Sequence, residues 1–283
     1  FMILSMGGFA IEDLILKILS DSMPISQILV YVGVLGAVLL TFVSKMKQIP
    51  ILQAGLFDNK LFLIRTFSDM LGAVLFIIAI SLMPLSTVSS ILQTTPLFVT
   101  LGAFLLFKES VGWRRWGAVF IGFFGILLIL KPDAGSLDAK SFIALLAVAF
   151  IALRDIVTRR LKSNINSITV SLYAFILTAV GGILCVPFFE NFVILTFNQW
   201  FVVLISTLVG CSSYLLLVLA TRQGDVSVIS PFRYTRLIFA LILAILFLGE
   251  RPDILALSGM AIIVLSGCYT LWREKVRGQS SSV

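Results

Sequence analysis

Hydrophobic residues occur in long blocks along this chain rather than alternating with polar ones. A helix of about 20 mostly apolar residues is long enough to cross the hydrocarbon core of a bilayer. Blocks of this length follow one another from the N-terminus, separated by short segments that are richer in polar residues. The pattern predicts ten transmembrane helices, at residues 2–20, 26–44, 61–82, 84–107, 113–131, 139–161, 167–188, 197–220, 226–248 and 253–272.

The composition leads to the same class of protein. Of the 283 residues, 59% are hydrophobic and 12% are charged, and the mean hydropathy is +1.11. Soluble proteins average about 45–50% apolar and about 25% charged residues, because polar groups must cover their surface. The sequence therefore predicts an all-α integral membrane protein. It excludes a soluble enzyme, a disordered chain and a nucleic-acid-binding protein.

The positive charges are distributed unevenly between the predicted loops. Cytoplasmic loops of membrane proteins carry an excess of Lys and Arg. With the N-terminus inside, thirteen Lys and Arg residues fall on the inner segments and three, Lys131, Lys140 and Arg251, on the outer segments. This predicts a multi-pass protein of a cell inner membrane with cytoplasmic N- and C-termini. It also explains the net charge of +7 without a nucleic-acid partner.

Several kinds of chemistry lack the residues that they need. The chain has no histidine, and Cys185, Cys211 and Cys268 lie within apolar blocks at spacings that match no zinc or redox motif. A phosphate-binding GxxxxGK[ST] loop is also missing from the sequence. We therefore expect no catalytic residue, no metal site and no cofactor. The chain starts at Phe1 rather than Met, and we expect its native start further upstream and no cleavable signal peptide.

The two halves of the chain resemble each other. Residues 83–109 align without gaps with residues 224–250, and both segments end on a glutamate. The repeating unit contains five predicted helices, and an odd number inverts the second copy relative to the first, an arrangement common in transporters. The identical aligned pairs include Ser86/Ser227, Ser89/Ser230, Thr94/Thr235, Phe98/Phe239, Ala103/Ala244, Leu105/Leu246 and Glu109/Glu250. The predicted divisions are a first five-helix repeat at 1–131, an external linker at 132–137, a second five-helix repeat at 138–275 and a C-terminal tail at 276–283.

The same segments resemble a known family. Residues 84–109, the Gly122/Gly125 pair, and residues 231–250 and 257–272 are similar to the drug/metabolite transporter superfamily, in its EamA-type branch of ten-helix carriers. The resemblance implies alternating-access movement of small organic metabolites, by importers and exporters alike. It also implies substrates such as amino acids, S-adenosylmethionine, vitamins and quaternary amines. The PFRYTRL segment looks most like the S-adenosylmethionine carriers, whereas the second predicted helix lacks an arginine that many relatives have.

Ionisable residues inside the predicted helices are the main candidates for function. A charge in the membrane is costly unless it has a partner or faces a cavity. Lys17 lies near a helix end, from where its side chain can reach the interface. The others comprise four acids and four bases, a balance that favours mutual pairing. They are Glu12, Asp13, Asp69, Asp155, Arg65, Arg154, Arg233 and Arg236.

Arg233 and Arg236 are spaced i, i+3 and therefore point to nearly the same side of one helix, near the middle of the membrane. Like charges repel and need anions, and a guanidinium can bind a carboxylate through two parallel hydrogen bonds. The candidate anions are Asp155, Asp13, Glu12 and a substrate carboxylate or phosphate. The sequence leaves open whether either arginine contacts substrate or serves only in structural pairing.

Polar residues occupy matching positions in the two repeats. Gln93, Thr94 and Thr95 align with residues 234–236, and a proline lies close by in both halves, at Pro96 and Pro231. Proline removes one backbone hydrogen bond and tends to kink a helix, which leaves carbonyl groups free to line a cavity. The predicted substrate-binding residues of one shared cavity are Arg233, Arg236, Tyr234, Gln93, Thr94, Thr95, Asp13 and Glu12.

A second charged group lies nearer the predicted cytoplasmic side. Arg65 and Asp69 are spaced i, i+4 and can pair on one helix face, and Arg154 is followed directly by Asp155. For these four residues we predict a coupling or gating role, with a structural role as the alternative. The candidates for an aromatic cavity wall, with packing or lipid contact as the alternative, are Phe67, Tyr173 and Tyr234.

The sequence thus predicts a secondary active transporter for a small amphiphilic or zwitterionic organic metabolite, such as an amino acid or S-adenosylmethionine. The alternative is an exporter of amino acids or drug-like compounds. An integral membrane enzyme acting on lipid lacks a catalytic cluster, and a channel lacks a filter-like segment. Protons are a candidate coupling ion, carried by Asp13, Glu12 or Asp155, although exchange or facilitated diffusion fits equally well. Membrane lipid is the expected surrounding, and the sequence is compatible with a monomer or a homodimer.

Overall fold

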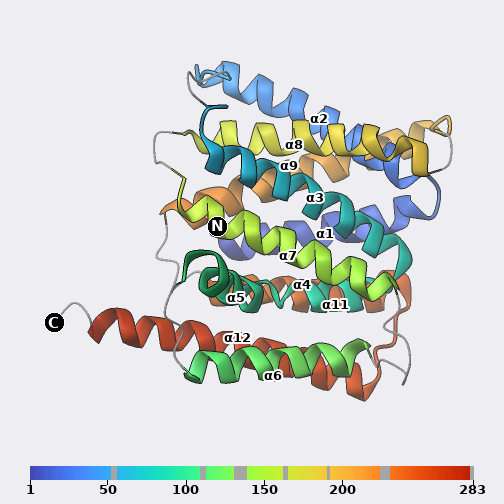
Figure 1. Cartoon of the computed structure of the whole chain (residues 1–283). Coiled ribbons are helices and arrows are strands. Elements are labelled where there is room, and N and C mark those ends of the chain that lie inside the picture. The colour runs from blue at the N-terminus through green and yellow to red at the C-terminus, as the bar shows by residue number, and fades with distance from the viewer. Residues whose placement is uncertain are drawn as a thin grey trace.

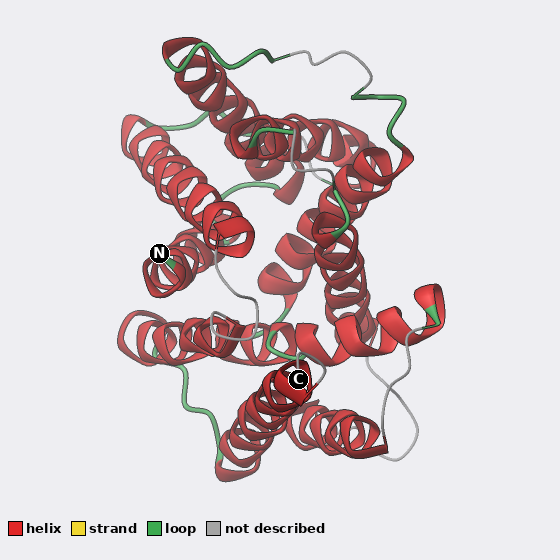
Figure 2. Ribbon diagram, turned by 90° about the vertical axis from the view of Figure 1, so that its left-hand side faces the viewer, coloured by secondary structure: helices red, strands yellow, loops and turns green. Residues whose placement is uncertain are grey.

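The structure consists of helices. It is a computed structural model, and it describes residues 1–51, 56–108, 113–130, 139–161, 165–189, 192–223 and 230–280. No strand occurs among these residues, as Figures 1 and 2 show from two directions. The elements are α1 (Met2–Ser20), α2 (Ile25–Met46), α3 (Lys60–Leu82), α4 (Leu85–Leu92), α5 (Thr95–Phe107), α6 (Trp113–Leu130), α7 (Ala139–Arg159), α8 (Ser167–Cys185), η1 (Val186–Phe188), α9 (Phe197–Gln223), η2 (Ser230–Tyr234), α11 (Thr235–Leu248) and α12 (Ile254–Ser280).

Several helical segments have the length and the apolar composition of membrane spans. Shorter apolar helical stretches occupy Val119–Ile129 and Ile254–Tyr269. Large apolar side chains such as Phe42, Phe124 and Phe201 are more than half exposed, an arrangement that suits contact with lipid. The chain is a multi-pass membrane protein. Within the described ranges, the six segments long and apolar enough to cross a membrane are Ile25–Met46, Lys60–Leu82, Leu85–Leu106, Lys140–Thr158, Ser167–Phe188 and Phe197–Ala220.

Most helix positions agree with the sequence-based expectation. The predicted spans at 2–20, 61–82 and 139–161 differ from α1, α3 and α7 by at most two residues at either end. The predicted span at 167–188 corresponds to α8 with η1 as its last turn. The last helix differs more, because α12 continues eight residues beyond the predicted end at 272.

The predicted span at 84–107 is not a continuous helix. α4 ends at Leu92, and α5 begins only at Thr95. Pro96 has no N–H group, so the carbonyl of Leu92 lacks the donor that a continuous helix would supply. The Thr95 hydroxyl donates to this carbonyl instead, and the Thr94 hydroxyl donates to the Ile91 carbonyl at 2.6 Å. The kink expected at Pro96 is therefore a full interruption of the helix.

A comparable irregularity precedes α11. The predicted span at 226–248 begins in residues that lie outside the described part of the chain. From Ser230 the backbone forms the 3₁₀ helix η2, and α11 follows at Thr235. In the alignment of residues 83–109 with 224–250, the starts of α5 and α11 differ by one residue. Both halves thus place irregular backbone just before an apolar helix.

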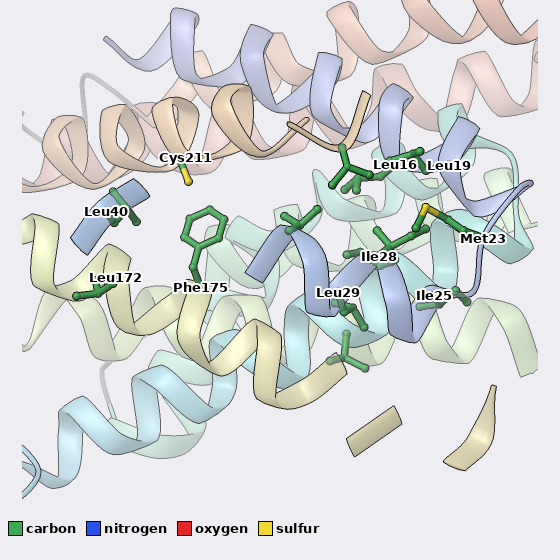
Figure 3. Packing of buried hydrophobic residues seen from close by; sticks show 14 residues of the cluster. Leu16, Leu19, Met23, Ile25, Ile28, Leu29, Leu40, Leu172, Phe175 and Cys211 are labelled. Atoms are coloured by element: carbon green, nitrogen blue, oxygen red, sulfur yellow. The ribbon is translucent and has the colours of Figure 1, made fainter. Parts of the chain in front are cut away.

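Helices that are distant in sequence pack side by side. α2 lies along α8, α3 along α7, α1 along α9, and α6 along α12 (Figure 1). Further contacts join α1 to α11, α5 to α7, α3 to α8 and α2 to α9. Figure 3 shows an apolar cluster between α1, α2, α8 and α9. It includes Leu16 of α1, Ile28 and Leu29 of α2, Phe175 of α8 and Cys211 of α9. The core therefore lies between the N-terminal and C-terminal halves rather than inside either one.

Two charged side chains, Lys17 and Glu250, form hydrogen bonds with backbone groups at the ends of neighbouring helices. The ammonium group of Lys17, near the end of α1, donates to the carbonyls of Ile80 at 2.9 Å and Met83 at 3.3 Å, at the C-terminal end of α3. Glu250, which follows α11, accepts the backbone N–H groups of Leu85 at 2.6 Å and Ser86 at 3.0 Å. Both contacts satisfy backbone groups that a helix end leaves without intrahelical partners, and both place a charge where the helix dipole favours it.

Close packing of α2 against α8 depends on small residues. A Cβ atom added to Gly33 would collide with the backbone of Ala179, whereas one added to Gly117 would meet nothing within 4 Å. We expect Gly33→Ala to destabilise the protein by about 1–3 kcal/mol, because the two helices must move apart. Gly117→Ala should leave the stability unchanged or raise it by up to about 1 kcal/mol, because alanine favours helix.

The measurement is the temperature at which the detergent-solubilised protein loses its monodisperse state. Wild type, Gly33→Ala and Gly117→Ala are compared under the same conditions. Equal transition temperatures for the two variants would contradict the close approach of α2 and α8.

Candidate substrate site

A cavity lies among the central helices. Its volume is about 170 Å³, and its lining comes from α1, α2, α3, α7, α8, α9, η2 and α11 and from the junction of α4 and α5. The irregular backbone at Gln93 and at Arg233 borders this cavity. Both halves of the sequence therefore contribute charged and polar side chains to one cavity, whose lining is mostly apolar.

Arg236 and Asp13 form a two-pronged ion pair at the cavity wall. The Nε atom of Arg236 donates to Asp13 Oδ2 at 3.0 Å, and Nη2 donates to Oδ1 at 2.8 Å. The Arg236 guanidinium also lies 4.9 Å from the ring centre of Phe9 and 5.4 Å from that of Phe76. Asp13 is 2% exposed, so the pair is shielded from water. The two hydrogen bonds fix the orientation of the guanidinium relative to the carboxylate.

A second set of charges connects α3, α7 and η2. Arg233 Nη1 lies 2.8 Å from Asp155 Oδ2, and Arg154 lies 2.9 Å from both Asp155 and Asp69. Arg65 lies 3.3 Å from Asp69, the i, i+4 pair expected from the sequence. The set thus contains three arginines and two aspartates. We call these five residues the arginine chain.

Tyr214 of α9 joins the arginine chain. Its hydroxyl donates to Asp69 Oδ2 at 2.6 Å and accepts a hydrogen bond from Arg65. Arg65 also donates to the backbone carbonyl of Val170 in α8 at 3.2 Å. Asp69 is therefore surrounded by three donors, from Arg65, Arg154 and Tyr214, and is fixed in position.

Glu12 is the exception among the acidic residues of the predicted helices. Its side chain lines the cavity and lies against Gly210 of α9. Among the described residues it forms no hydrogen bond and no ion pair, although Asp13, the next residue, is fully engaged with Arg236. A Cβ atom at position 210 would collide with the Glu12 carboxylate, so Gly210 provides the space that the carboxylate occupies.

The structure brings most of the predicted substrate-binding residues to the cavity. Thr94 is buried, with its hydroxyl bonded to the Ile91 carbonyl, and does not line it. Tyr234 lies against Gly267 of α12 and does not line it either. Those that do line it are Glu12, Asp13, Gln93, Thr95, Arg233 and Arg236.

Two of the four predicted coupling or gating residues line the cavity, and the other two lie behind them. Asp69 and Arg154 line the cavity, whereas Arg65 and Asp155 do not. Arg65 and Asp155 instead contact the residues that do, Arg65 through Asp69 and Asp155 through Arg154 and Arg233.

The aromatic wall is made of residues that the sequence did not indicate. Phe67 is 53% exposed on the outside of α3, and Tyr173 packs against Phe57 and Phe62 in a separate cluster. A lining position for Phe9 follows from its i, i+4 spacing to Asp13 once Asp13 is placed. For Tyr214, the sequence offers one indication, namely a hydroxyl-bearing side chain within an apolar block. The aromatic residues that line the cavity are Phe9, Phe76, Phe175 and Tyr214.

A central cavity with charged lining residues from both halves of a multi-pass membrane protein is an arrangement typical of small-molecule transporters. The sequence profile of the EamA-like transporter family matches residues 1–131 and 140–272. The chain belongs to the EamA-like transporter family. This confirms the resemblance inferred from residues 84–109 and 231–250.

Individual relatives are named for different small molecules. The chain is 29% identical to an S-adenosylmethionine uptake transporter of Rickettsia bellii over 198 residues, 69% of this chain and 67% of the relative. It is 28% identical to a riboflavin transporter of Vibrio cholerae over 75% of this chain and 72% of that protein. It is 24% identical to a pseudopaline exporter of Pseudomonas aeruginosa over 96% of this chain and 95% of that protein.

A solved crystal structure has the same fold. It superposes with a TM-score of 0.64 at 16% identity, over 95% of this chain and 97% of the other. This similarity extends through nearly the whole chain.

The Arg236–Asp13 pair provides a test of the site. Asp13→Asn removes the counter-charge of a largely buried guanidinium, and Arg236→Gln leaves a buried carboxylate without its partner. Breaking such a pair by one substitution costs about 3–5 kcal/mol, because the remaining charge stays desolvated. We expect each single variant to unfold at a lower temperature than wild type, and the double variant to recover most of the loss.

The thermal stability of the detergent-solubilised variants measures this coupling. Asp21→Asn, at an exposed position just after α1, is the matched control for loss of a carboxylate. Strictly additive effects of the two single changes would show that the residues do not interact.

Proposed function

We propose that this protein is a secondary active transporter that moves a small amphiphilic or zwitterionic organic metabolite across a bacterial inner membrane by alternating access. The observation that supports it best is the central cavity with charged lining residues from both halves of the chain. The names of the relatives, which include an S-adenosylmethionine uptake transporter and a riboflavin transporter, support a small organic substrate. An amino acid or a molecule like S-adenosylmethionine is the substrate class that we favour.

The proposal includes ten spans in two inverted repeats, 1–131 and 138–275, joined by an external linker. The packing supports it. If the two halves are exchanged, α1, α2, α3, α5 and α6 correspond to α7, α8, α9, α11 and α12. The α1–α9 contact then corresponds to α7–α3, the α1–α11 contact to α7–α5, and the α2–α9 contact to α8–α3. All of these contacts occur. The α2–α8 and α6–α12 contacts transform into themselves, as contacts on a pseudo-twofold axis do.

Alternating access requires the halves to move relative to each other. Two ion pairs join the halves at the cavity: Asp13 with Arg236, and Asp69 with Arg154. By contrast, Arg65 pairs with Asp69 within the first half and Arg233 with Asp155 within the second. We assign the Asp69–Arg154 contact a gating role, because it can break and re-form without leaving either residue without a partner.

Other features of the proposal rest on the sequence. They are cytoplasmic termini, a proton as coupling ion, surrounding lipid, and a monomeric or homodimeric state. Export of amino acids or drug-like compounds is the second candidate function, and the match to a pseudopaline exporter over 96% of the chain favours it. A membrane enzyme acting on lipid has less support, because the family consists of transporters.

Uptake into proteoliposomes tests the proposed function. The panel contains radiolabelled S-adenosylmethionine, amino acids and riboflavin, each measured with and without a pH gradient. We expect saturable uptake of one class. Ala73→Trp should reduce that uptake about tenfold or more, because an indole at this lining position occupies the cavity. Ala73→Ser, which changes the volume little, is the matched control.

Two outcomes would contradict the proposal. The first is the absence of saturable uptake or counterflow for every panel member. The second is equal uptake by wild type and a folded Ala73→Trp variant, which would place the pathway outside this cavity.

A further inference from the structure

The charges around the cavity do not cancel locally. The arginine chain carries three positive and two negative groups, which leaves an excess of one positive charge. Arg236 and Asp13 cancel each other. Glu12 has a carboxyl group with no partner among the described residues. The cavity thus has an excess positive charge on its α3, α7 and η2 wall and an acidic side chain without a partner between α1 and α9.

The excess positive charge is accessible from the cavity. Arg154 and Arg233 both line it, and their side chains remain 13% and 20% exposed. A guanidinium has five N–H donors, more than the contacts with Asp69 and Asp155 use. These two arginines therefore have donors left for a carboxylate in the cavity.

The surroundings of Glu12 suit a cation. Phe9 precedes Glu12 by three residues on α1, and Tyr214 follows Gly210 by four residues on α9, so both rings lie about one turn from the carboxylate. The two rings contact each other edge to face, with centroids 6.5 Å apart. The rings of Phe9 and Tyr214 already lie near the guanidinium groups of Arg236 and Arg65, so the carboxyl group of Glu12 is the feature that attracts an ammonium or sulfonium group here.

We propose that the cavity binds a zwitterion in one orientation, with its cationic ammonium or sulfonium group at Glu12 and its carboxylate at Arg154 and Arg233. This inference rests on the proposed function. The carboxylate of such a ligand offsets the excess positive charge of the arginine chain, and its cation is the partner that Glu12 lacks among the described residues. A charge kept away from water gains most from a partner. Glu12 is then the residue that selects ligands carrying a cation over otherwise similar neutral ligands.

Competition experiments in proteoliposomes test this assignment. The labelled probes are methionine and S-adenosylmethionine. Unlabelled N-acetylmethionine lacks the cationic charge of methionine, and methionine methyl ester lacks its anionic charge. With wild type, we expect N-acetylmethionine to be about tenfold weaker as a competitor than methionine, the ratio typical of a lost charge-assisted hydrogen bond.

Glu12→Gln removes the charge and keeps the shape of the side chain. We expect methionine and N-acetylmethionine to fall within about threefold of each other as competitors in this variant, since both now meet a neutral amide. Discrimination against methionine methyl ester should persist, because it depends on Arg154 and Arg233. Asp21→Asn is the matched control and should keep the wild-type ratios.

A second variant keeps the test valid where Glu12→Gln does not fold. Gly210→Ala leaves the charge in place but forces the Glu12 carboxylate to move. We expect it to weaken competition by methionine more than competition by N-acetylmethionine.

The outcomes separate the two proposals. No uptake of any panel member overturns the proposed function and this inference with it. Saturable uptake that N-acetylmethionine inhibits as well as methionine does overturns the inference alone, as does uptake confined to riboflavin. A Glu12→Gln variant that loses its response to a pH gradient but keeps the wild-type ratios assigns Glu12 to proton binding and also overturns it.

Discussion

Charged groups within the membrane need partners, and this requirement determines how the helices of this protein are arranged. Apolar side chains gain little by facing another helix rather than lipid, so apolar contact alone leaves the relative position of two spans poorly defined. An ion pair is different, because an unpaired charge in hydrocarbon is costly. The contacts of Asp13 with Arg236 and of Asp69 with Arg154 align helices of one half with helices of the other. All four of these residues line the cavity.

The interruptions of two apolar segments contribute to the same place. The break between α4 and α5 presents Gln93 and Thr95 to the cavity, and the 3₁₀ turn before α11 presents Arg233. A continuous helix would direct its backbone groups along its own axis, with none available to the cavity. Irregular backbone at membrane depth is tolerated where it borders a polar space inside the protein. The polar side chains and the backbone geometry therefore depend on each other.

Much of the fold could be predicted from the sequence because the apolar blocks have the length that a bilayer demands. The ends of α1, α3 and α7 follow directly from this pattern. The break at Gln93 and Thr94 did not, because a single proline is compatible with a kinked helix as well as with an interrupted one. The decisive factor is that the Thr95 hydroxyl takes the place of the missing backbone donor, a local contact that composition cannot indicate.

The sequence predicted which charged residues form the candidate site, but it did not predict which of them pair with each other. The sequence identified the four acids and four arginines and the tendency to pair, yet several pairings were equally consistent with it. Helix packing selects Asp13 for Arg236 and leaves Glu12, the adjacent residue, against Gly210. Tyr234 was misplaced for the same reason, since its orientation toward Gly267 depends on the position of α12. The importance of Tyr214 becomes visible only when α9 packs against α1 and the Tyr214 hydroxyl meets Asp69 of α3.

The contact between Glu250 and the first turn of α4 has a mechanical consequence. Its carboxylate holds the backbone N–H groups of Leu85 and Ser86, so the C-terminal end of α11 and the N-terminal end of α4 are joined at one side of the molecule. As long as these hydrogen bonds hold, the two ends move as one unit. Because α4 is held to the end of α11, we expect any bending between α4 and α5 to occur at Gln93 and Thr94, the two residues that separate these helices.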